Sequence, residues 1–244
     1  MSIPAPDADV PARVRELAGS ARLAPVWRND DGGVTFEATD ADGARFIKYG
    51  PRSAETTMAD EAARMRWAAP FTPVPRVLDV GGDDTHEWLV TAALPGRSAV
   101  DPRWIADAAT AVRAIGEGLR ALHDSLPVAA CPFRWDVETR FAKAGARRIR
   151  IPADLRTPPP VDRLVVCHGD ACAPNTLISD AGMWTAHVDL GALGVADRWA
   201  DIAVAALSTG WNYGPGWEHA LVEAYGVPFD AVRMEYYQRL WEAT

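Results

Sequence analysis

The chain has 244 residues, nearly half of them apolar, and a formal net charge of −8. This length suffices for one large domain or two modest ones with real cores. The acidic balance argues against nucleic acid as a partner, because binding a phosphate backbone needs a basic face, and it is compatible with a cationic ligand. No apolar run approaches the ~20 residues of a membrane span, and the N-terminus lacks the features of a signal peptide. We therefore expect a cytoplasmic protein without a membrane partner.

The first third of the chain predicts a small antiparallel sheet. Short apolar runs with strand-like alternation are separated by Gly-rich turn signals. The expected strands and hairpin lie at residues 23–27, 34–38, 45–49 and 77–91. Helical spacing precedes them at residues 12–19 and interrupts them at residues 55–69. A connector at residues 92–96 indicates the boundary between two domains.

The rest of the chain predicts mainly helices. Helical spacing is expected over residues 103–125, 134–150, 197–209, 215–225 and 230–242. Because strands come first and helices later, the pattern favours a two-lobed α+β protein over an alternating parallel sheet. We expect one domain over residues 1–93 and a second over residues 94–244.

One stretch of the second domain combines strand-like runs with polar side chains. Two apolar runs, ending at Cys167 and starting at Thr176, enclose a loop that carries Asp170 and Asn175. A third apolar run ends at Asp189. Two carboxylates and an amide between apolar strands are costly unless a cation or a reacting hydroxyl lies among them.

Phosphoryl transfer from a nucleotide requires this set of groups. Asp170 can accept the proton of a substrate hydroxyl, and Asn175 and Asp189 offer hard oxygen ligands for Mg²⁺. Lys48 supplies a cation for the phosphates, and the Gly32–Gly33 pair lets backbone approach phosphates without a Cβ in the way. A strand-end lysine or a Gly-Gly turn alone is common. The specific signal is therefore the spacing of Asp170, Asn175 and Asp189.

The run from His168 to Asn175, of the form HGDxxxxN, is followed by Asp189-Leu190-Gly191 and by the segment 193–203. This pattern resembles the aminoglycoside phosphotransferase family, and most of all the branch that acts on the 3′ or 3″ hydroxyl. The resemblance covers most of the chain. It implies a protein-kinase-like fold, with a small antiparallel-sheet N-lobe for nucleotide and a larger, mainly helical C-lobe. It also implies an antibiotic-resistance kinase that transfers the γ-phosphate of ATP or GTP to a hydroxyl of an aminoglycoside or a related cationic compound.

The resemblance also implies roles for individual residues. Asp170 resembles the catalytic aspartate, and Asn175 and Asp189 resemble the magnesium ligands. Lys48 resembles the phosphate-binding lysine, and Glu61, on the following helix, the glutamate that pairs with it. Asp60 is the weaker candidate for that pairing.

Three further roles follow from the same resemblance. The backbone from Thr91 to Ala93 would be the adenine-binding hinge. Asp201 resembles the aspartate that braces the catalytic loop, and His168 is expected to hold this loop rather than to transfer a proton.

On the acceptor side, the family's 3′ enzymes end in an acidic and aromatic segment that helps to bind the amino sugar. This chain keeps Glu242 there, and Trp217 and Glu218 resemble a second family segment. The chain departs from the family pattern at Ala192 and Leu207, where related enzymes often carry arginine.

Other classes of function remain open at this point. The same chemistry would serve a kinase of a different metabolite or antibiotic, and the same residues would serve a nucleotide-binding module without catalysis. A protein kinase is disfavoured, because no segment after Asp189 resembles an activation loop that ends in Ala-Pro-Glu. The expected partners are a nucleotide and a small-molecule acceptor, and the expected state is a monomer or homodimer.

Overall fold

A computed structural model describes residues 9–29, 32–52 and 57–244 of the chain. Asp30, Asp31, Gly32 and Gly33 form the first turn signal of the sequence, and the two aspartates lie outside the described residues. The chain divides into two compact units. The N-terminal unit includes the described residues up to Ala69 and also Pro75–Leu94, and the C-terminal unit includes Pro70–Val74 and Pro95–Thr244. Among the described residues, no helix is long and apolar enough to cross a membrane.

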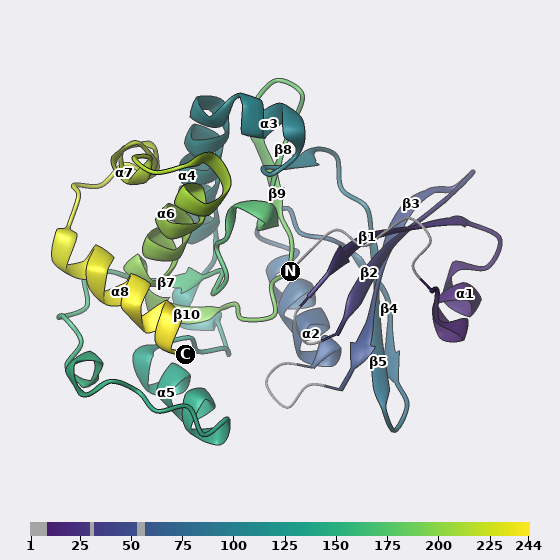
Figure 1. Ribbon diagram of the computed structural model, residues 1–244, viewed down its shortest axis with the longest axis horizontal. Helices are drawn as coiled ribbons and strands as arrows, with labels where there is room; N and C mark the ends of the chain where they lie inside the picture. Colours follow the sequence, from purple (N-terminus) through teal and green to yellow (C-terminus); the bar gives the residue numbers. More distant parts are fainter. Residues whose placement is uncertain (1–8, 30–31, 53–56) are drawn as a thin grey trace. The chain divides into compact units, whose positions relative to one another are not determined.

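The N-terminal unit is built on a five-stranded antiparallel sheet with the strand order β1-β2-β3-β5-β4 (Figure 1). The strands are β1 (Arg22–Arg28), β2 (Val34–Asp40), β3 (Gly43–Pro51), β4 (Val77–Gly82) and β5 (His86–Ala92). Aspartates close two of the hairpins. The Oδ1 atom of Asp40 accepts the N–H of Asp42 at 2.9 Å, and Oδ1 of Asp83 accepts those of Thr85 and His86. These hydrogen bonds lower the pKa of Asp83 to about 2.

The core of this unit lies between the sheet and helix α1 (Ala12–Ala18). Phe36, Ile47 and Val90 are neighbours across β2, β3 and β5, and each is at most 4% exposed. Val14 of α1 packs in the same cluster. Because side chains alternate along a strand, Lys48, which follows Ile47 on β3, points to the opposite face of the sheet.

Helix α2 (Met58–Ala68) packs against β4 and β5 of the same unit. Its N-cap is Thr57, whose hydroxyl accepts the N–H of Asp60, while the Asp60 carboxylate accepts the N–H of Thr57. The carboxylate of Asp60 is thus engaged in the capping box. The neighbouring Glu61 is buried, with 6% of its surface exposed.

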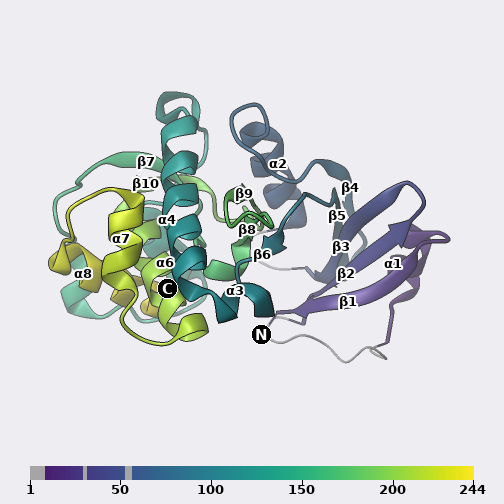
Figure 2. The same ribbon diagram turned by 90° about the horizontal axis from the view of Figure 1, so that it is seen from above.

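The C-terminal unit is mainly helical (Figure 2). Its helices are α3 (Pro102–Ala106), α4 (Ala108–Ser125), α5 (Val137–Ala146), α6 (Trp199–Tyr213), α7 (Glu218–Tyr225) and α8 (Ala231–Ala243). Its short strands are β6 (Arg97–Ser98), β7 (Leu164–Cys167), β8 (Thr176–Ile178), β9 (Trp184–His187) and β10 (Gly194–Asp197). They form two small sheets, one of β10 and β7 and one in the order β6-β8-β9.

Two of the predicted helices are shorter than expected because aspartates begin new helices inside them. The helix expected over residues 103–125 is two helices, since Asp107 leaves the helical conformation and its carboxylate accepts the N–H of Thr110 at the start of α4. The helix expected over residues 134–150 begins only after its N-cap, Asp136.

Strand β10 was not predicted. We expected a helix over residues 197–209, but Asp197 ends a strand that pairs with Leu164 of β7, and α6 begins at Trp199 and continues to Tyr213. Four residues are too few to establish an alternating pattern, so the sequence alone could not distinguish this strand from a helix start.

Helices α4 and α7 pack directly against each other (Figure 2). Gly116 of α4 makes this possible, because a Cβ at that position would lie 2.7 Å from Cβ of Ala224 and 2.8 Å from the carbonyl oxygen of Leu221. The close approach allows His123 of α4 to meet Tyr225 of α7 in the interior, where they are 3% and 1% exposed.

Candidate active site

The polar loop between β7 and β8 brings two of the predicted site residues into contact. The side-chain Nδ2 of Asn175 donates to the backbone oxygen of Asp170 at 3.0 Å and to its Oδ2 at 3.1 Å. Asn175 ends a single 3₁₀ turn, Ala173–Asn175, that leads directly into β8. Because Nδ2 is engaged with Asp170, the amide oxygen is the atom of Asn175 that remains to coordinate a cation.

The carboxylate of Asp170 combines burial with incomplete hydrogen bonding. Its Oδ1 is buried and has no partner with hydrogen-bond geometry among the described residues, although the thiol of Cys172 lies beside the carboxylate. Burial raises the pKa of Asp170 above its ordinary value, and the charge of Asp189 raises it further. A buried polar atom without a partner costs about 1–3 kcal/mol.

Asp189 follows β9 with a backbone conformation that is rare for residues with a side chain. Its φ angle is +64°, in the left-handed region. The neighbouring residues hold it there: the N–H of Val188 donates to the Asn175 carbonyl at 3.0 Å, and Leu190 is fully buried. Such strain persists only where the surroundings fix the backbone, and it is concentrated at functional sites.

These groups fit a hard divalent cation. An amide oxygen from Asn175 and a carboxylate from Asp189 are the oxygen donors that Mg²⁺ prefers. The charge of Asp189 already disfavours ionisation of Asp170, and a bound cation would relieve that repulsion.

His168, the first residue of the loop motif, is held by backbone at both ring nitrogens. Its Nε2 donates to the carbonyl of Val188 at 2.9 Å, and its Nδ1 accepts the N–H of Asp170 at 3.2 Å. The side chain is completely buried. Both ring nitrogens therefore take part in hydrogen bonds that fix the loop.

Asp201 of α6 binds the start of the loop through both carboxylate oxygens. Oδ2 accepts the N–H of His168 at 2.5 Å, and Oδ1 accepts that of Gly169 at 2.9 Å. Oδ2 also receives Nε2 of His123 at 3.0 Å, and Nδ1 of His123 meets the hydroxyl of Tyr225 at 2.8 Å. Burial alone would raise the pKa of Asp201, but its hydrogen bonds lower the pKa below the ordinary value.

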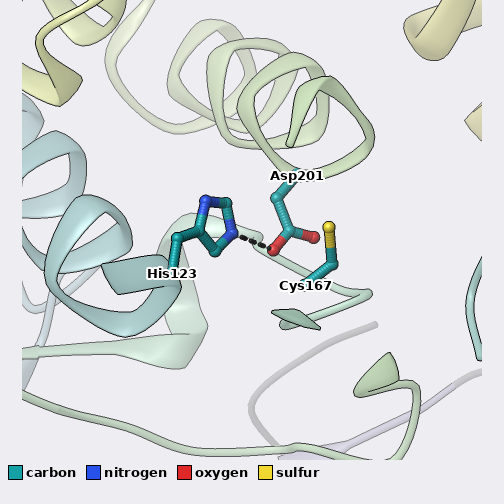
Figure 3. Close-up of side chains that lie close together, drawn as sticks. All are labelled: His123, Cys167 and Asp201. Carbon is teal, nitrogen blue, oxygen red and sulfur yellow. Dashed lines mark hydrogen bonds and ion pairs between the residues drawn. The ribbon is translucent and has the colours of Figure 1, made fainter. Parts of the chain in front are cut away.

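His123, Asp201 and Cys167 could be taken for a metal site, because their ligand atoms lie within 4.8 Å of one another (Figure 3). Each is already engaged with protein groups. The Cys167 thiol donates to the carbonyl of Asp197 at 3.4 Å, and burial raises the pKa of this thiol so that it stays protonated. The cluster is therefore a buried hydrogen-bond network that supports the loop.

Gly169 is required by the close packing of the loop. Its φ angle is +84°, and a Cβ at this position would lie 2.2 Å from the carbonyl oxygen and 2.7 Å from the Cβ of Ala192. Ala192, one of the two departures from the family pattern, thus contacts the backbone of the loop directly.

In the N-terminal unit, the predicted partners Lys48 and Glu61 form an ion pair. Nζ of Lys48, on β3, lies 2.8 Å from Oε1 of Glu61, on α2. The lysine side chain is 27% exposed and the glutamate side chain 8%. Asp60, the weaker candidate, is occupied in the capping box of α2.

The Gly32–Gly33 pair lies in the connection between β1 and β2. Gly32 has a φ angle of +85°. The N–H of Gly33 donates to Oδ1 of Asn29 at 2.6 Å, so this amide is already occupied within the loop.

The expected hinge begins inside the sheet. Thr91 lies within β5 and pairs with Phe46 of β3, and the N–H of Ala93 donates to the carbonyl of Ala44 at 3.1 Å. The Ala93 amide is therefore engaged, and its carbonyl is the group that could accept a hydrogen bond from a base.

The structure does not bring the three acceptor-side candidates together. Glu242, on α8, is exposed and lines a cavity of about 630 Å³. Three arginines line the same cavity: Arg147, Arg150 and Arg239. Trp217 and Glu218 stand at the start of α7, are half-buried, and are not among the residues that line this cavity. Glu242 therefore lies in more basic surroundings than a site for a cationic sugar would suggest.

A family model described as the phosphotransferase enzyme family matches residues 28–237 of the chain. The chain belongs to this family. It is 35% identical over 253 residues to an aminoglycoside 3′-phosphotransferase of Streptomyces fradiae, covering 89% of this chain and 93% of the relative. It is 31% identical over 249 residues to the streptomycin 3″-kinase of Streptomyces griseus, covering 88% and 89%. The resemblance inferred from the loop motif is thereby confirmed, and this phosphotransferase is a homologue of aminoglycoside O-phosphotransferases.

Solved structures give the same result for the fold. A crystal structure of an aminoglycoside 3′-phosphotransferase of type VIII aligns with a TM-score of 0.80 at 27% identity, covering 95% of this chain and 97% of that one. The aminoglycoside phosphotransferase APH(3″)-Id of Streptomyces rimosus, in complex with ADP and streptomycin, aligns with a TM-score of 0.70 at 27% identity, covering 93% and 94%. The predicted kinase-like α+β fold is confirmed.

Sequence reasoning missed part of the support for the loop of this phosphotransferase. His123 and Tyr225 lie 102 residues apart and meet only because α4 and α7 pack closely. Short spacing patterns cannot reveal a contact of this kind. The one available signal was a polar histidine within the otherwise apolar face of a helical stretch, and on its own that signal is weak.

Proposed function

We propose that this phosphotransferase moves the γ-phosphate of ATP, or of GTP, to a hydroxyl of an aminoglycoside or a related hydroxylated cationic compound. The observation that supports this most is the largely buried carboxylate of Asp170, which accepts the side-chain amide of Asn175 at 3.1 Å and lies near the charge of Asp189. A substrate hydroxyl would donate to this carboxylate and be oriented for in-line attack on the γ-phosphorus. As the new P–O bond forms, the bond to the β–γ bridging oxygen breaks, and the hydroxyl proton passes to Asp170.

The other groups would stabilise charge. Asn175 and Asp189 would hold Mg²⁺, which when bound offsets negative charge on the phosphates. Lys48, kept in place by Glu61, would contact the phosphates with its ammonium group. Positioned cations of this kind contribute without covalent chemistry, and none of these groups would need to form a covalent intermediate.

We assign the nucleotide to residues 1–93 and catalysis to residues 94–244. Within the first segment, backbone at Gly32–Gly33 would lie against the phosphates, and backbone between Thr91 and Ala93 would bind the base through its carbonyl groups. These assignments draw on the family membership and on the glycine-containing connection between β1 and β2.

On the acceptor side we assign Trp217 and Glu218, with weaker support for Glu242. A carboxylate and an indole both suit a protonated amino sugar, because the first offers an ion pair and the second a cation–π contact. The arginines around Glu242 make it the least suited of the three.

The direct test is an ADP-release assay with purified protein, ATP or GTP, and Mg²⁺. The acceptor panel would contain aminoglycosides with and without a free 3′ hydroxyl, streptomycin, other hydroxylated antibiotics and simple amino alcohols. ³¹P NMR of the product identifies the phosphorylated hydroxyl. ADP release only with acceptors outside the aminoglycosides would assign the chain to a different small-molecule kinase.

The role of Asp170 is tested by Asp170→Ala. We expect turnover to fall by about 10²–10⁴-fold, the usual contribution of a positioned acid or base, while nucleotide still binds in a calorimetric titration. Full activity in this variant would refute the assignment. Nucleotide binding by wild-type protein with no turnover of any acceptor would instead favour a binding module without catalysis.

A further inference from the structure

Helix α6 contacts the catalytic loop at a second point, seven residues beyond Asp201. The hydroxyl of Ser208 is completely buried, and its Oγ accepts the N–H of Ala173 at 2.9 Å. Seven residues are about two helical turns, so Asp201 and Ser208 lie on the same face of α6. Neither the loop motif nor the family resemblance pointed to this serine.

We propose that Ser208 is a positioning residue for phosphoryl transfer: its hydroxyl fixes the second half of the loop and thereby places Asn175 relative to Asp170. This inference rests on the proposed function, because it concerns the distance between the group that orients the hydroxyl and a ligand of the cation. Asp201 holds the beginning of the loop, and Ser208 holds its end.

The contact acts on the turn that carries Asn175. Ala173 begins the 3₁₀ turn, and the first N–H groups of any helical turn have no partner within it. Ser208 satisfies this donor from outside the turn. The next residue, Pro174, has no N–H, and its carbonyl accepts the hydroxyl of Ser98 at 2.9 Å. The N–H of Asn175 then closes the turn onto the carbonyl of Cys172 at 3.0 Å.

Ser208 is itself held in place. Nδ2 of Asn212, one turn further along α6, donates to the Ser208 carbonyl at 2.8 Å and reaches its Oγ at 3.2 Å. The thiol of Cys172 lies beside both the Ser208 hydroxyl and the Asp170 carboxylate. A change at Ser208 would therefore reach both halves of the loop.

A neighbouring residue provides a matched control. Thr209 is equally buried, but its hydroxyl donates to the carbonyl of Ala206 within α6 at 2.6 Å. Ser208→Ala and Thr209→Ala each remove one buried hydroxyl from the same helix, and Thr209→Ala also removes a methyl group, which makes it the more demanding control. Only the first removes a loop contact.

The experiment compares these two variants with wild type by hydrogen exchange at the Ala173 amide and by steady-state kinetics. We expect Ser208→Ala to speed exchange at Ala173 at least about tenfold while the His168 amide, held by Asp201, stays protected. We expect kcat to fall about 10- to 100-fold, the usual effect of losing a group that orients a metal-coordinating residue. We also expect the Mg²⁺ concentration for half-maximal rate to rise, with little change in the KM for acceptor. Thr209→Ala should match wild type in its exchange at Ala173, its kcat and its Mg²⁺ requirement.

Asn212→Ala provides a second variant if Ser208→Ala folds poorly. Because Asn212 is only half-buried and donates to the carbonyl and hydroxyl of Ser208, we expect the same changes at a smaller size. Unchanged exchange at Ala173 in Ser208→Ala, or kinetic changes equal to those of Thr209→Ala, would overturn the proposal. If wild-type protein turns over no acceptor, the proposed function fails, and the role of Ser208 in turnover fails with it. The exchange measurement alone still decides whether Ser208 holds the loop.

Discussion

The two units hold their candidate functional groups in different ways. In the N-terminal unit, Lys48 extends from a strand and is held by an ion pair with Glu61, with about a quarter of the lysine side chain exposed. In the C-terminal unit, the loop around Asp170 is held through its peptide groups by buried side chains of α6, chiefly Asp201 and Ser208.

The two units should therefore differ in how they tolerate substitution. An ion pair that is partly exposed contributes modestly to folding, so altering a lysine held this way should cost ligand binding more than stability. Buried hydrogen bonds to peptide N–H groups serve both stability and geometry, because each donor left unsatisfied carries a penalty. We therefore expect substitutions in the loop supports to impair folding and activity together, and substitutions at Lys48 to impair activity far more than folding.

The largest effect is expected for Gly169→Ala. The new Cβ would overlap the carbonyl of Ala192, and the positive φ angle disfavours any side chain. We expect activity to fall at least about 100-fold, as when reacting groups are displaced by about 1 Å, with a clear loss of thermal stability. Gly145→Ala in α5 is the control, since a Cβ there meets nothing within 4 Å, and it should leave both properties intact or raise stability slightly. Equal behaviour of the two variants in a melting and activity assay would contradict the account of the loop.

Next in size is Asp201→Ala. Two peptide N–H groups and the ring of His123 lose their acceptor in the interior, at about 1–3 kcal/mol each, so we expect the free energy of unfolding to fall by about 3 kcal/mol or more. Urea denaturation measures this. Asp124→Ala, which removes an exposed partner of Arg120, should change stability by less than about 0.5 kcal/mol. A similarly small change for Asp201→Ala would mean that its network does not support the fold.

A smaller effect on stability is expected for Lys48→Ala. Loss of the ammonium group should lower kcat/KM for nucleotide by about 100-fold, as for removal of one electrostatic stabiliser, while the free energy of unfolding falls by no more than about 1–2 kcal/mol. Arg45→Ala is the matched control on the same strand, because Arg45 pairs with Asp40 at 2.7 Å. Arg45→Ala should lower the free energy of unfolding without lowering the affinity for nucleotide. If Arg45→Ala lost nucleotide affinity and Lys48→Ala kept it, Arg45 rather than Lys48 would be the cation that contacts the phosphates.

The smallest effect concerns Asp170→Asn and the dependence of stability on pH. Because the folded protein raises the pKa of Asp170, its ionised form is disfavoured by folding, and that penalty is present at pH values above the raised pKa. The neutral amide lacks this penalty, so the inactive variant should be more stable than wild type at pH 7 by about 1 kcal/mol. The gap should narrow as the pH falls through the raised pKa, because wild type then becomes protonated. Melting curves of both proteins between pH 4 and pH 8 measure this difference in stability. A difference that grows toward acid pH would show that folding lowers the pKa of Asp170.

The sequence predicted much of the fold and singled out the loop on which the candidate site is built. Alternating strands and Gly-rich turn signals identified the N-terminal sheet, and the spacing of Asp170, Asn175 and Asp189 identified the loop and the family. Most of the contacts that hold the loop could not be predicted from the sequence. Asp201 was recognised only by family resemblance, and Ser208, which bonds a residue 35 positions earlier, was not recognised at all. Short strands such as β10 were missed for a related reason, because their partners are distant in the chain and their own pattern is too brief.

The supports of the loop between β7 and β8 act on peptide groups, which every amino acid carries. Asp201 and Ser208 bind the backbone of His168, Gly169 and Ala173. These hydrogen bonds place no demand of their own on the side chains at positions 171 and 172, where packing sets the limit: Ala171 is buried, and the thiol of Cys172 lies beside the Asp170 carboxylate. During evolution, residues of similar small size would be expected to replace one another at these two positions while helix α6 keeps the loop in place.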